Sequence, residues 1–327
     1  MSHLRWNPLL GTYNMVAPNR QHRPHLPTGQ CPFCPGSGQV PDEYGVLLYP
    51  NDFPALSPNH ATPEAGPTDF YHTAKAAGHC DVVLYSSDHL KGLAQLPLEH
   101  VAQLINVWAA RFQELAADPE VKYIFPFESR GEEVGVTIHH PHGQIYSYPF
   151  VPLKVQAELD NSLKHYNATG NSLLLDMVAT EMQDGRRMIT ENEHFAAFIP
   201  WFTDYPYGVY IVNRQGKSSI SDMDTKERTN LADILRQVVG AMDTLFGKPF
   251  PYMMCLYQRP VNSPEYADAN KYYPFHIEFY TPLRATDRVK WLASSETGAW
   301  AAANTLLVED TAPQLREALF RYQESQS

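Results

Sequence analysis

The sequence has few cysteines and no long apolar run. Four cysteines among 327 residues are too few for a disulfide framework, which argues against a small disulfide-rich secreted scaffold. No apolar stretch approaches the roughly 20 residues that span a bilayer. The N-terminal segment MSHLRWNPLL also lacks the basic region and apolar stretch of a signal peptide. We therefore expect a soluble, cytoplasmic protein without a membrane partner.

Positive charge is scarce as well. The chain has 25 Lys and Arg against 36 Asp and Glu, for a formal net charge of −11. A general nucleic-acid binder needs a basic field to attract phosphate backbones, so we exclude that class. A local arginine cluster can still bind a small anionic molecule. The length and the 43% hydrophobic content fit a globular protein with two core-forming units or one large one.

The first 78 residues are rich in Pro, Gly, Asn and His and show little periodicity. A short strand over residues 46–49 is the exception, because it precedes a turn-like Pro-Asn-Asp sequence. We expect irregular structure in this region, pinned to a core by something other than burial.

From residue 81 onward, one order of predicted elements occurs twice. Each copy contains strand, helix, strand and strand, judged from alternating apolar residues and from apolar residues at helical spacing. The first copy comprises residues 81–86, 101–115, 122–127 and 134–148, and the second comprises 195–200 with 209–213, 231–245, 252–257 and 275–280. We expect an internal duplication with halves at residues 1–165 and 166–327. The predicted class is α+β, with two mostly antiparallel sheet halves and flanking helices.

Three further signals concern helices and the second copy. Asp224 followed by Glu227 fits a capping box at the start of the second long helix. Shorter patterns predict a bridging helix over residues 173–182 and a C-terminal helix over 311–322. In the last strand of the second copy, His276 and Glu278 stand roughly where His140 and His142 stand in the first.

The motif His140-Pro141-His142-Gly143-Gln144 carries the most chemical information. Alternate residues of an extended segment share one face, so we expect the two histidines and Gln144 to point the same way. Pro141 forces its predecessor into an extended conformation, and Gly143 has no side chain to keep a phosphate from the backbone. The motif predicts a site; the alternative is a pair of surface histidines near a sheet edge.

Cys31 and Cys34 form a Cys-x-x-Cys pair that can place two thiolates on one divalent ion. Zinc is the default for paired thiolates with imidazoles, and His89 and His140 are the candidate further ligands. A metal here would anchor the irregular N-terminal region. It would also hold His142 rigidly through the backbone. The alternative is a reduced thiol pair with no metal.

A neutral imidazole at His142 can attack phosphorus and form a phosphoramidate. The attacking nitrogen must be deprotonated, so we expect the other ring nitrogen to donate its proton to an acceptor such as a backbone carbonyl. Gln144 can donate to a phosphoryl oxygen as charge develops there, but it cannot act as a general acid. Leaving groups that need no proton fit this limitation. The motif therefore favours transfer between phosphate esters.

With Ile145 and Tyr146, this motif resembles the active-site signature of the galactose-1-phosphate uridylyltransferases, the transferase branch of the histidine triad superfamily. The hydrolase branch has histidine where this chain has Gln144. The resemblance covers nearly the whole chain and implies a duplicated histidine-triad-like fold. Its pieces are Asn7-Pro8-Leu9 with Gly11, residues 18–24, 31–34, 51–53, 87–89, 127–144, 193–195 and 275–282.

The resemblance implies a ping-pong reaction. UDP-glucose would uridylylate His142 and release glucose 1-phosphate, and galactose 1-phosphate would then take the uridylyl group to give UDP-galactose. It also implies a structural zinc ion on Cys31, Cys34, His89 and His140.

A homodimer is implied too. Lys290 and Glu296 align with family residues that contact the hexose phosphate bound in the other subunit of a dimer.

Two groups of residues match the family's other substrate contacts. Arg20 and Arg23 match a phosphate-contacting pair; the alternative is a solvated basic run. Asn51, Asp52 and Phe53 match residues around the uridine, where the aromatic ring can pack on the base and the polar pair can meet the ribose. Their alternative is a plain turn.

The sequence also departs from the family pattern. Ser129 stands where Asn is common, and Thr137 replaces a serine near the α-phosphate while keeping the hydroxyl group. Some members carry a second metal on one Glu and three His. The matching residues here are Glu158, Gln258, His276 and Glu278. Only one histidine remains, so the sequence puts the second metal in doubt, and the changes after Lys290 leave sugar specificity open.

Two other functions stay open. One is a related nucleotidyltransferase or phosphorylase that acts on another NDP-sugar such as ADP-glucose, on another hexose 1-phosphate, or with inorganic phosphate as acceptor. The other is a zinc-stabilised nucleotide-binding module in which His142 only contacts phosphate.

Overall fold

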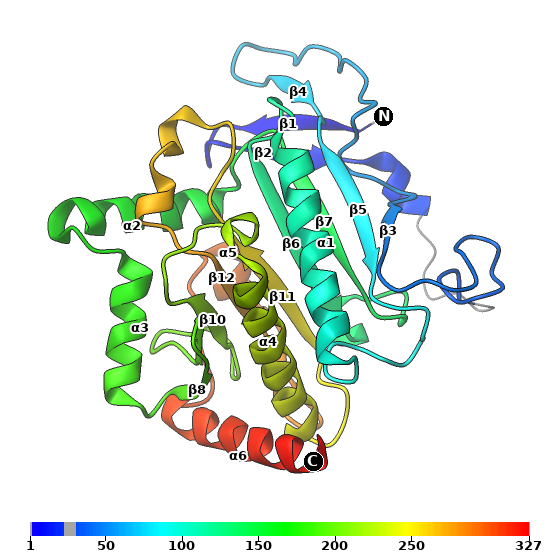
Figure 1. The fold of residues 1–327 in the computed structure, drawn as a ribbon. Helices are drawn as coiled ribbons and strands as arrows, with labels where there is room; N and C mark the ends of the chain where they lie inside the picture. Colours follow the sequence, from blue (N-terminus) through cyan, green and yellow to red (C-terminus); the bar gives the residue numbers. More distant parts are fainter. Residues whose placement is uncertain (1, 23–30, 327) are drawn as a thin grey trace.

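The computed structural model describes residues 2–22 and 31–326. Its centre is a nine-stranded sheet in the order β3-β5-β7-β6-β11-β12-β10-β9-β8, with antiparallel pairing throughout (Figure 1). The strands, in that order, are Leu47–Pro50, His79–Leu84, His142–Tyr148, Tyr123–Arg130, Tyr252–Tyr257, His276–Tyr280, Tyr210–Asn213, Phe195–Phe198 and Met188–Glu191. The helices are α1 Leu98–Ala116, α2 Leu153–Thr169, α3 Leu173–Asp184, α4 Thr225–Leu245, α5 Ser294–Gly298 and α6 Val308–Gln326.

The strand order contains the internal duplication. In the first half, β5, α1, β6 and β7 give the spatial order β5-β7-β6, and in the second, β10, α4, β11 and β12 give β11-β12-β10. The second order mirrors the first. Pairing of β6 with β11 joins the two halves into one continuous antiparallel sheet. The predicted repeat and the α+β class are therefore confirmed.

One face of this sheet is covered by α1 and α4, which lie side by side in Figure 1. Alternate strand residues point into this core because side chains of a strand alternate between faces. The buried residues that form it include Ile124, Ile145, Met254, Ile277, Trp108 and Leu235. The helix α6 packs across α4 and closes the second half.

The opposite face is only partly covered. The helix α2 packs through Val155 and Leu159 on Tyr123 and Tyr257, and α3 covers the far end of the sheet. Because Ile145 points to the α1 side, its neighbours in β7 point to this second face. His142 and Gln144 therefore share the open face, as predicted.

The strand that carries His142 and Gln144 is shorter than predicted. The sequence pattern predicts one strand over residues 134–148, but β7 begins only at His142, after a short helical turn over Glu132–Val134 and an irregular segment. Pro141 has no N–H to donate to a ladder, which is the physical reason for the late start. His140 therefore does not continue the face of His142 and Gln144; it is fully buried elsewhere.

The N-terminal region is more regular than predicted. Strands β1 His3–Asn7, β2 Thr12–Val16 and β4 Thr73–Lys75 form a small sheet in the order β2-β1-β4. Leu4 of this sheet is buried in a cluster that includes Leu56, Cys80 and Tyr146. Apolar packing thus holds this part of the chain against the large sheet.

The predicted helices are confirmed, and α2 was missed. The capping box forms as expected, because Glu227 N donates to Asp224 Oδ1 at 2.8 Å and Asp224 N donates to Glu227 Oε2 at 2.7 Å. The helix α2 has a weak apolar stripe with only Val155, Leu159 and Ser162 buried. Its periodicity is therefore hard to detect in the sequence.

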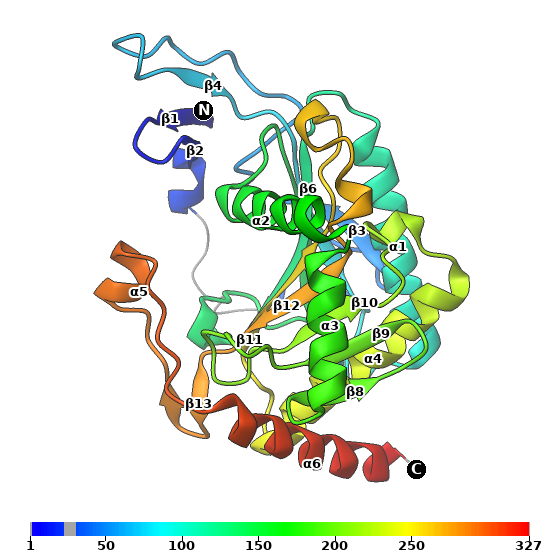
Figure 2. The ribbon, with the colours of Figure 1, turned by 90° about the vertical axis from the view of Figure 1, so that its left-hand side faces the viewer.

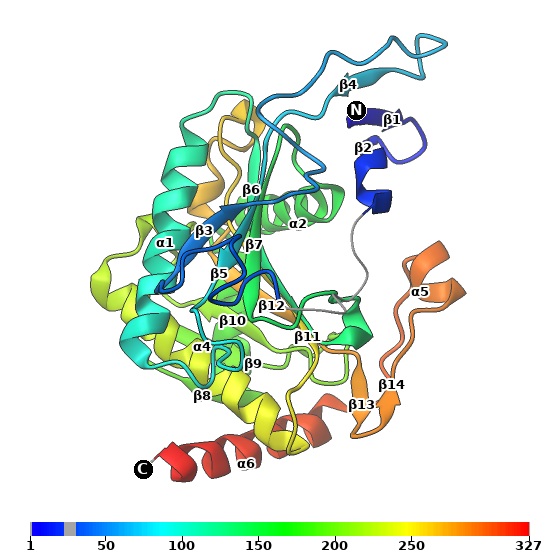
Figure 3. The same cartoon turned by 90° about the vertical axis from the view of Figure 1, so that its right-hand side faces the viewer.

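A hairpin and a short helix stand away from the central sheet in Figures 2 and 3. They comprise β13 Leu283–Ala285, β14 Arg288–Val289 and α5, and we call residues 283–300 the arm. The arm exposes Trp291 and Trp300. Among the described residues, no helix combines the length and apolar character needed to cross a membrane.

Gly78 is required where β5 meets β7. Its φ is +132°, and a Cβ atom there would lie 2.0 Å from the backbone oxygen of Ser147. We expect Gly78→Ala to lower the free energy of unfolding by about 1–3 kcal/mol more than Gly170→Ala, measured by urea denaturation. Gly170 is the matched control, because its φ is +79° but no atom lies within 4 Å of the added methyl group. Equal losses in the two variants would contradict this packing argument.

Candidate active site and metal cluster

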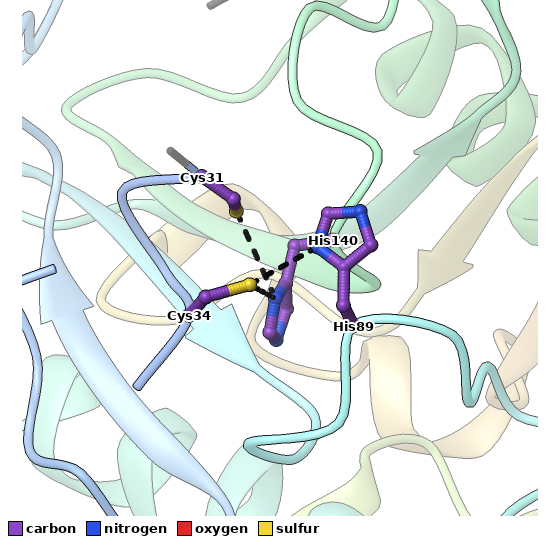
Figure 4. Close-up of side chains that lie close together, drawn as sticks. All are labelled: Cys31, Cys34, His89 and His140. Carbon is purple, nitrogen blue, oxygen red and sulfur yellow. Dashed lines mark hydrogen bonds between the residues drawn. The ribbon is translucent and has the colours of Figure 1, made fainter. Parts of the chain in front are cut away.

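Four predicted metal ligands come together from three separate parts of the chain. The ligand atoms of Cys31, Cys34, His89 and His140 all lie within 4.8 Å of one another. Cys34 Sγ is 3.2 Å from His89 Nδ1 and 3.6 Å from His140 Nδ1, and Cys31 Sγ is 3.9 Å from His140 Nδ1. Figure 4 shows the two sulfurs and the two rings gathered around one point. A tetrahedral ion with bonds of about 2.3 Å to sulfur and 2.0 Å to nitrogen separates such atoms by about 3.5 Å.

The charge chemistry of the cluster also suits a cation. Burial and the neighbouring Cys31 raise the pKa of the Cys34 thiol, because two adjacent thiolates repel each other in a poorly solvated place. A bound divalent cation reverses this effect and stabilises both thiolates. The residues present therefore fit a metal ion with two thiolate and two imidazole ligands.

His140 is held by contacts on its other ring nitrogen. Its Nε2 lies 2.8 Å from the backbone oxygen of Ser86 and 3.1 Å from the hydroxyl group of Tyr44, which itself donates to Phe33 O at 2.7 Å. Donation from Nε2–H to the Ser86 carbonyl leaves the Nδ1 lone pair toward the cysteines. Burial lowers the pKa of His140, which favours the neutral ring that a metal requires.

His142 shows the tautomer expected of a nucleophile. It is the first residue of β7, and its Nδ1 lies 2.7 Å from the backbone oxygen of His140. Since a carbonyl can only accept, Nδ1 carries the proton and the lone pair lies on Nε2. The predicted backbone acceptor is thus confirmed, and it belongs to a residue of the metal cluster.

His142 borders a hollow of about 250 Å³. The walls of the hollow include His89, Ser129, Arg130, Gly131, His140 and His142. Arg130 is paired with Asp243 at 3.0 Å, so its charge is already partly balanced. A larger hollow of about 900 Å³ lies beside β1 and β4 and contains none of the predicted site residues.

Gln144 lies beside the turn predicted to meet uridine. Asn51 Nδ2 donates to Gln144 Oε1 at 3.4 Å, and Asn51 Oδ1 accepts from Phe53 N at 2.9 Å. Asp52 is held by the hydroxyl group of Tyr49 at 3.0 Å. The contact with Asn51 assigns the carbonyl end of Gln144 to the turn, so its NH₂ end is the donor for a ligand.

The predicted phosphate contacts are placed in part. Arg20 lies in a helical turn over Pro18–His22, and its Nη1 donates to Tyr146 OH at 3.3 Å, two residues beyond Gln144 in β7. Arg23 lies outside the described residues. Ser129 lines the hollow from β6, and Thr137 belongs to the irregular segment that precedes β7.

Lys290 and Glu296 lie on the arm, and neither lines the hollow at His142. The Lys290 ammonium group donates to Asp204 O and lies 5.0 Å from the ring centre of Tyr205. Glu296 accepts from the backbone N–H of Ala293 at 3.1 Å at the start of α5. Within one chain, the structure therefore does not bring these two residues to the other predicted contacts.

Gly143 has a different role from the one predicted. A Cβ atom at this position would lie 2.8 Å from Tyr85 OH and 3.1 Å from Phe127 O. Since Gly143 alternates with His142 and Gln144, this missing side chain faces the covered side of the sheet. Packing of β7 on Tyr85 therefore requires the glycine; phosphate approach does not explain it.

Sequence reasoning missed Glu128, which lies opposite Gly143 in β6. Its carboxyl group is buried and accepts from Tyr85 OH at 2.9 Å and from Tyr252 OH at 3.1 Å. Burial raises the pKa of Glu128 to about 7, although Arg130 and the two hydroxyl groups act in the opposite direction. Strand alternation offered a signal for its burial. Glu128 lies four residues after buried Ile124 in the same strand, so the two side chains point to the same face of the sheet.

Glu128 should make stability depend on pH. Because the pKa of Glu128 is higher in the folded than in the unfolded chain, the protonated acid favours folding. This stabilisation is complete below pH 4.5, the ordinary pKa of a glutamate, and is lost as the pH rises through about 7, the pKa in the fold. Relative to Glu128→Gln, which mimics the protonated acid, the wild type should lose on the order of 3 kcal/mol between pH 4.5 and pH 8. Thermal melts across this range test the expectation, with Glu324→Gln on the exposed surface of α6 as control. Parallel pH curves for wild type and Glu128→Gln would refute it.

Comparison with known proteins places the chain in a family. The sequence patterns of two families match, the Galactose-1-phosphate uridyl transferase N-terminal domain over residues 1–152 and the C-terminal domain over residues 158–294. The galactose-1-phosphate uridylyltransferase of Thermotoga maritima is 36% identical over 321 residues, covering 97% of this chain and 98% of that protein. That of Streptomyces lividans is 33% identical over 292 residues, covering 86% and 77%.

Solved structures agree with the sequence relatives. A structure described as a uridylyltransferase has a TM-score of 0.87 at 30% identity, covering 98% of this chain and 99% of that one. An ADP-glucose phosphorylase from Arabidopsis thaliana has a TM-score of 0.75 at 22% identity, covering 97% and 99%, and shares the fold. The chain thus belongs to the galactose-1-phosphate uridylyltransferase family.

Proposed function

We propose that the protein transfers UMP from UDP-glucose to galactose 1-phosphate in two steps, through a uridylyl-His142 intermediate. Family membership supports the activity, and the observation that carries the mechanism is the 2.7 Å contact between His142 Nδ1 and His140 O. This contact gives the ring one tautomer and one orientation before substrate arrives. The nucleophile is therefore preorganised.

In the first step, His142 Nε2 attacks the α-phosphorus of UDP-glucose. A phosphorus–nitrogen bond forms while the bond to the bridging oxygen breaks, and glucose 1-phosphate leaves with the electron pair. This leaving group needs no proton, so the site requires no general acid. The ring becomes cationic on attack, and the His140 carbonyl stabilises its Nδ1–H. In the second step, a phosphate oxygen of galactose 1-phosphate attacks the same phosphorus. The phosphorus–nitrogen bond breaks with its electron pair returning to Nε2, which releases UDP-galactose and restores the neutral ring.

Gln144 would stabilise the charge that develops on the phosphoryl oxygens. Its carbonyl end accepts from Asn51, so its NH₂ group is the end that donates to the reacting phosphoryl group. We assign Arg20 and Arg23 to the substrate phosphates, Thr137 to the α-phosphate, and Asn51, Asp52 and Phe53 to the uridine. Ser129, which lines the hollow, is assigned to substrate binding.

We assign a structural zinc ion to Cys31, Cys34, His89 and His140. Four protein ligands leave a tetrahedral ion no open position for substrate, so the ion, when bound, supplies rigidity and not Lewis-acid chemistry. The residue it would hold most directly is His140, whose carbonyl orients the nucleophile.

We also propose a homodimer in which Lys290 and Glu296 serve the partner's hexose-phosphate site. The arm that carries them stands away from its own sheet and exposes Trp291 and Trp300, which supports a contact with another subunit. We divide the chain into functional halves at residues 1–165 and 166–327.

The reaction is tested with α-³²P-labelled UDP-glucose. We expect an acid-labile, base-stable label on the wild-type protein, and exchange of labelled glucose 1-phosphate into UDP-glucose without any galactose 1-phosphate. His142→Gly should lose the label and the exchange, at least 10³-fold, while still binding UDP-glucose in calorimetry. Retained exchange in His142→Gly would remove this residue as nucleophile. Parallel incubation with labelled ADP-glucose tests the alternative donor: labelling by ADP-glucose alone would reject UDP-glucose.

Metal removal tests the zinc assignment. Cys31→Ser should lower the zinc content and the melting temperature more than it lowers the rate of the transfer step, because the ion is a scaffold. Elemental analysis and thermal melts measure the first two quantities, and single-turnover labelling measures the third. Cys80→Ser replaces a thiol outside the cluster and should keep its zinc. If Cys31→Ser also kept its zinc, Cys31 would not be a ligand.

A further inference from the structure

A second group of ionisable side chains lies on the open face of the sheet. The ligand atoms of Glu158, His276 and Glu278 lie within 4.8 Å of one another, and His276 and Glu278 are almost completely buried. His276 Nε2 is 3.5 Å from Glu278 Oε1 and 3.9 Å from Glu158 Oε2. These are positions at which some family members hold a second metal, so the contacts decide whether such an ion fits here.

A half-exposed lysine already binds both carboxylates of this group. Lys154 lies one turn before Glu158 in α2, and its Nζ is 2.9 Å from Glu158 Oε1 and 2.5 Å from Glu278 Oε2. The same Nζ lies 3.0 Å from Tyr257 OH and 2.5 Å from Tyr280 OH. It also lies over the ring of Tyr257, 4.3 Å from the centroid. An ammonium group with three N–H donors thus meets four oxygens and an aromatic face.

Gln258, the fourth residue that matches the second-metal positions of the family, offers no ligand. The Oε1 atom of Gln258 accepts from the backbone N–H of Ile220 at 3.0 Å. Its Nε2 is buried and has no hydrogen-bond partner among the described residues, and an amide NH₂ group is a donor that does not bind metal ions. A metal would therefore have two carboxylates and one imidazole, and both carboxylates already bind Lys154.

The ammonium group and a divalent cation exclude each other here. Lys154 binds one oxygen of each carboxylate and His276 faces the other, so a divalent cation beside His276 would lie close to the ammonium group and the two positive charges would repel each other strongly. Losing the lysine proton instead is unfavourable between two carboxylates. The residues present therefore do not fit a second metal.

We propose that the ammonium group of Lys154 takes the place of a second metal ion, as a built-in cation that links α2 to strands β11 and β12. The ion pair with Glu278 crosses from the helix to β12, and the tyrosine contacts add β11. Because α2 begins five residues after β7 ends, this link also fixes the segment that follows the catalytic strand. Among the described residues, metal binding is then confined to the cysteine cluster.

Metal stoichiometry tests the proposal. The full-length protein is dialysed against Zn²⁺ or Fe²⁺, freed of excess ion and analysed for metal per chain. We expect one equivalent for the wild type and one for Glu278→Gln. Two equivalents in the wild type, with one of them lost in Glu278→Gln, would overturn the proposal.

Replacing the lysine tests the link itself. Lys154→Met should lower the melting temperature by on the order of 5 °C, whereas Lys164→Met, an exposed lysine of the same helix that lies outside this group, should not. Added Zn²⁺ or Mn²⁺ should restore part of the loss in Lys154→Met, where the carboxylates become available, and should not raise the wild-type value beyond one equivalent. Should Lys154→Met fail to fold, Lys154→Arg keeps the cation and should retain one metal equivalent. A melting temperature of Lys154→Met equal to that of Lys164→Met would overturn the proposal.

Discussion

The hydrogen bond from His142 Nδ1–H to the His140 carbonyl links the chemistry of this protein to its architecture. It fixes which ring nitrogen carries the proton, and it orients the ring with an atom of the backbone. That backbone is itself held by a buried imidazole, which Ser86 and Tyr44 contact on one side and two cysteines approach on the other. A metal ion at the cysteines would therefore act on His142, the proposed nucleophile, through the backbone that joins it to His140 and without touching substrate.

Comparison of His142 with its counterpart in the second copy separates what the backbone does to the ring from what the surroundings of the ring do. His276 opens β12 as His142 opens β7, and its Nδ1 also meets the carbonyl two residues earlier, Pro274 O, at 3.0 Å. Strand position therefore pairs His276 with His142, not with His140 as the sequence comparison indicated. In the second copy, however, the ring is buried, stacks on Tyr257 and turns Nε2 toward Glu278. In both copies, the backbone carbonyl two residues earlier holds the histidine ring. The ring of His276, however, is buried beside a carboxylate, which keeps a phosphate group away from it.

The sequence predicted those features that depend on local pattern or on residue chemistry. The long helices, the repeat and the capping box follow from periodicity, and the cysteine–histidine cluster follows from ligand chemistry. Two features, the packing at Gly143 and the partners of Glu128, depend on tertiary neighbours and could not be obtained this way. Gly143 is required by Tyr85, and the hydroxyl groups of Tyr85 and Tyr252 that meet buried Glu128 come from distant parts of the chain. His140 is different, because the residue that takes it out of the strand is its neighbour Pro141, which the sequence already shows.

The two ionisable clusters also differ in the source of positive charge. The first contains two thiols and two imidazoles and has no ammonium or guanidinium group within the ligand set, so its thiolates need an external cation. The second contains two carboxylates and has Lys154 between them. An ion supplied by the protein cannot be lost by dilution or chelation, whereas a bound metal can. On this proposal, the half with the proposed nucleophile would depend on an ion from solution for its order, whereas the other half carries its own counterion.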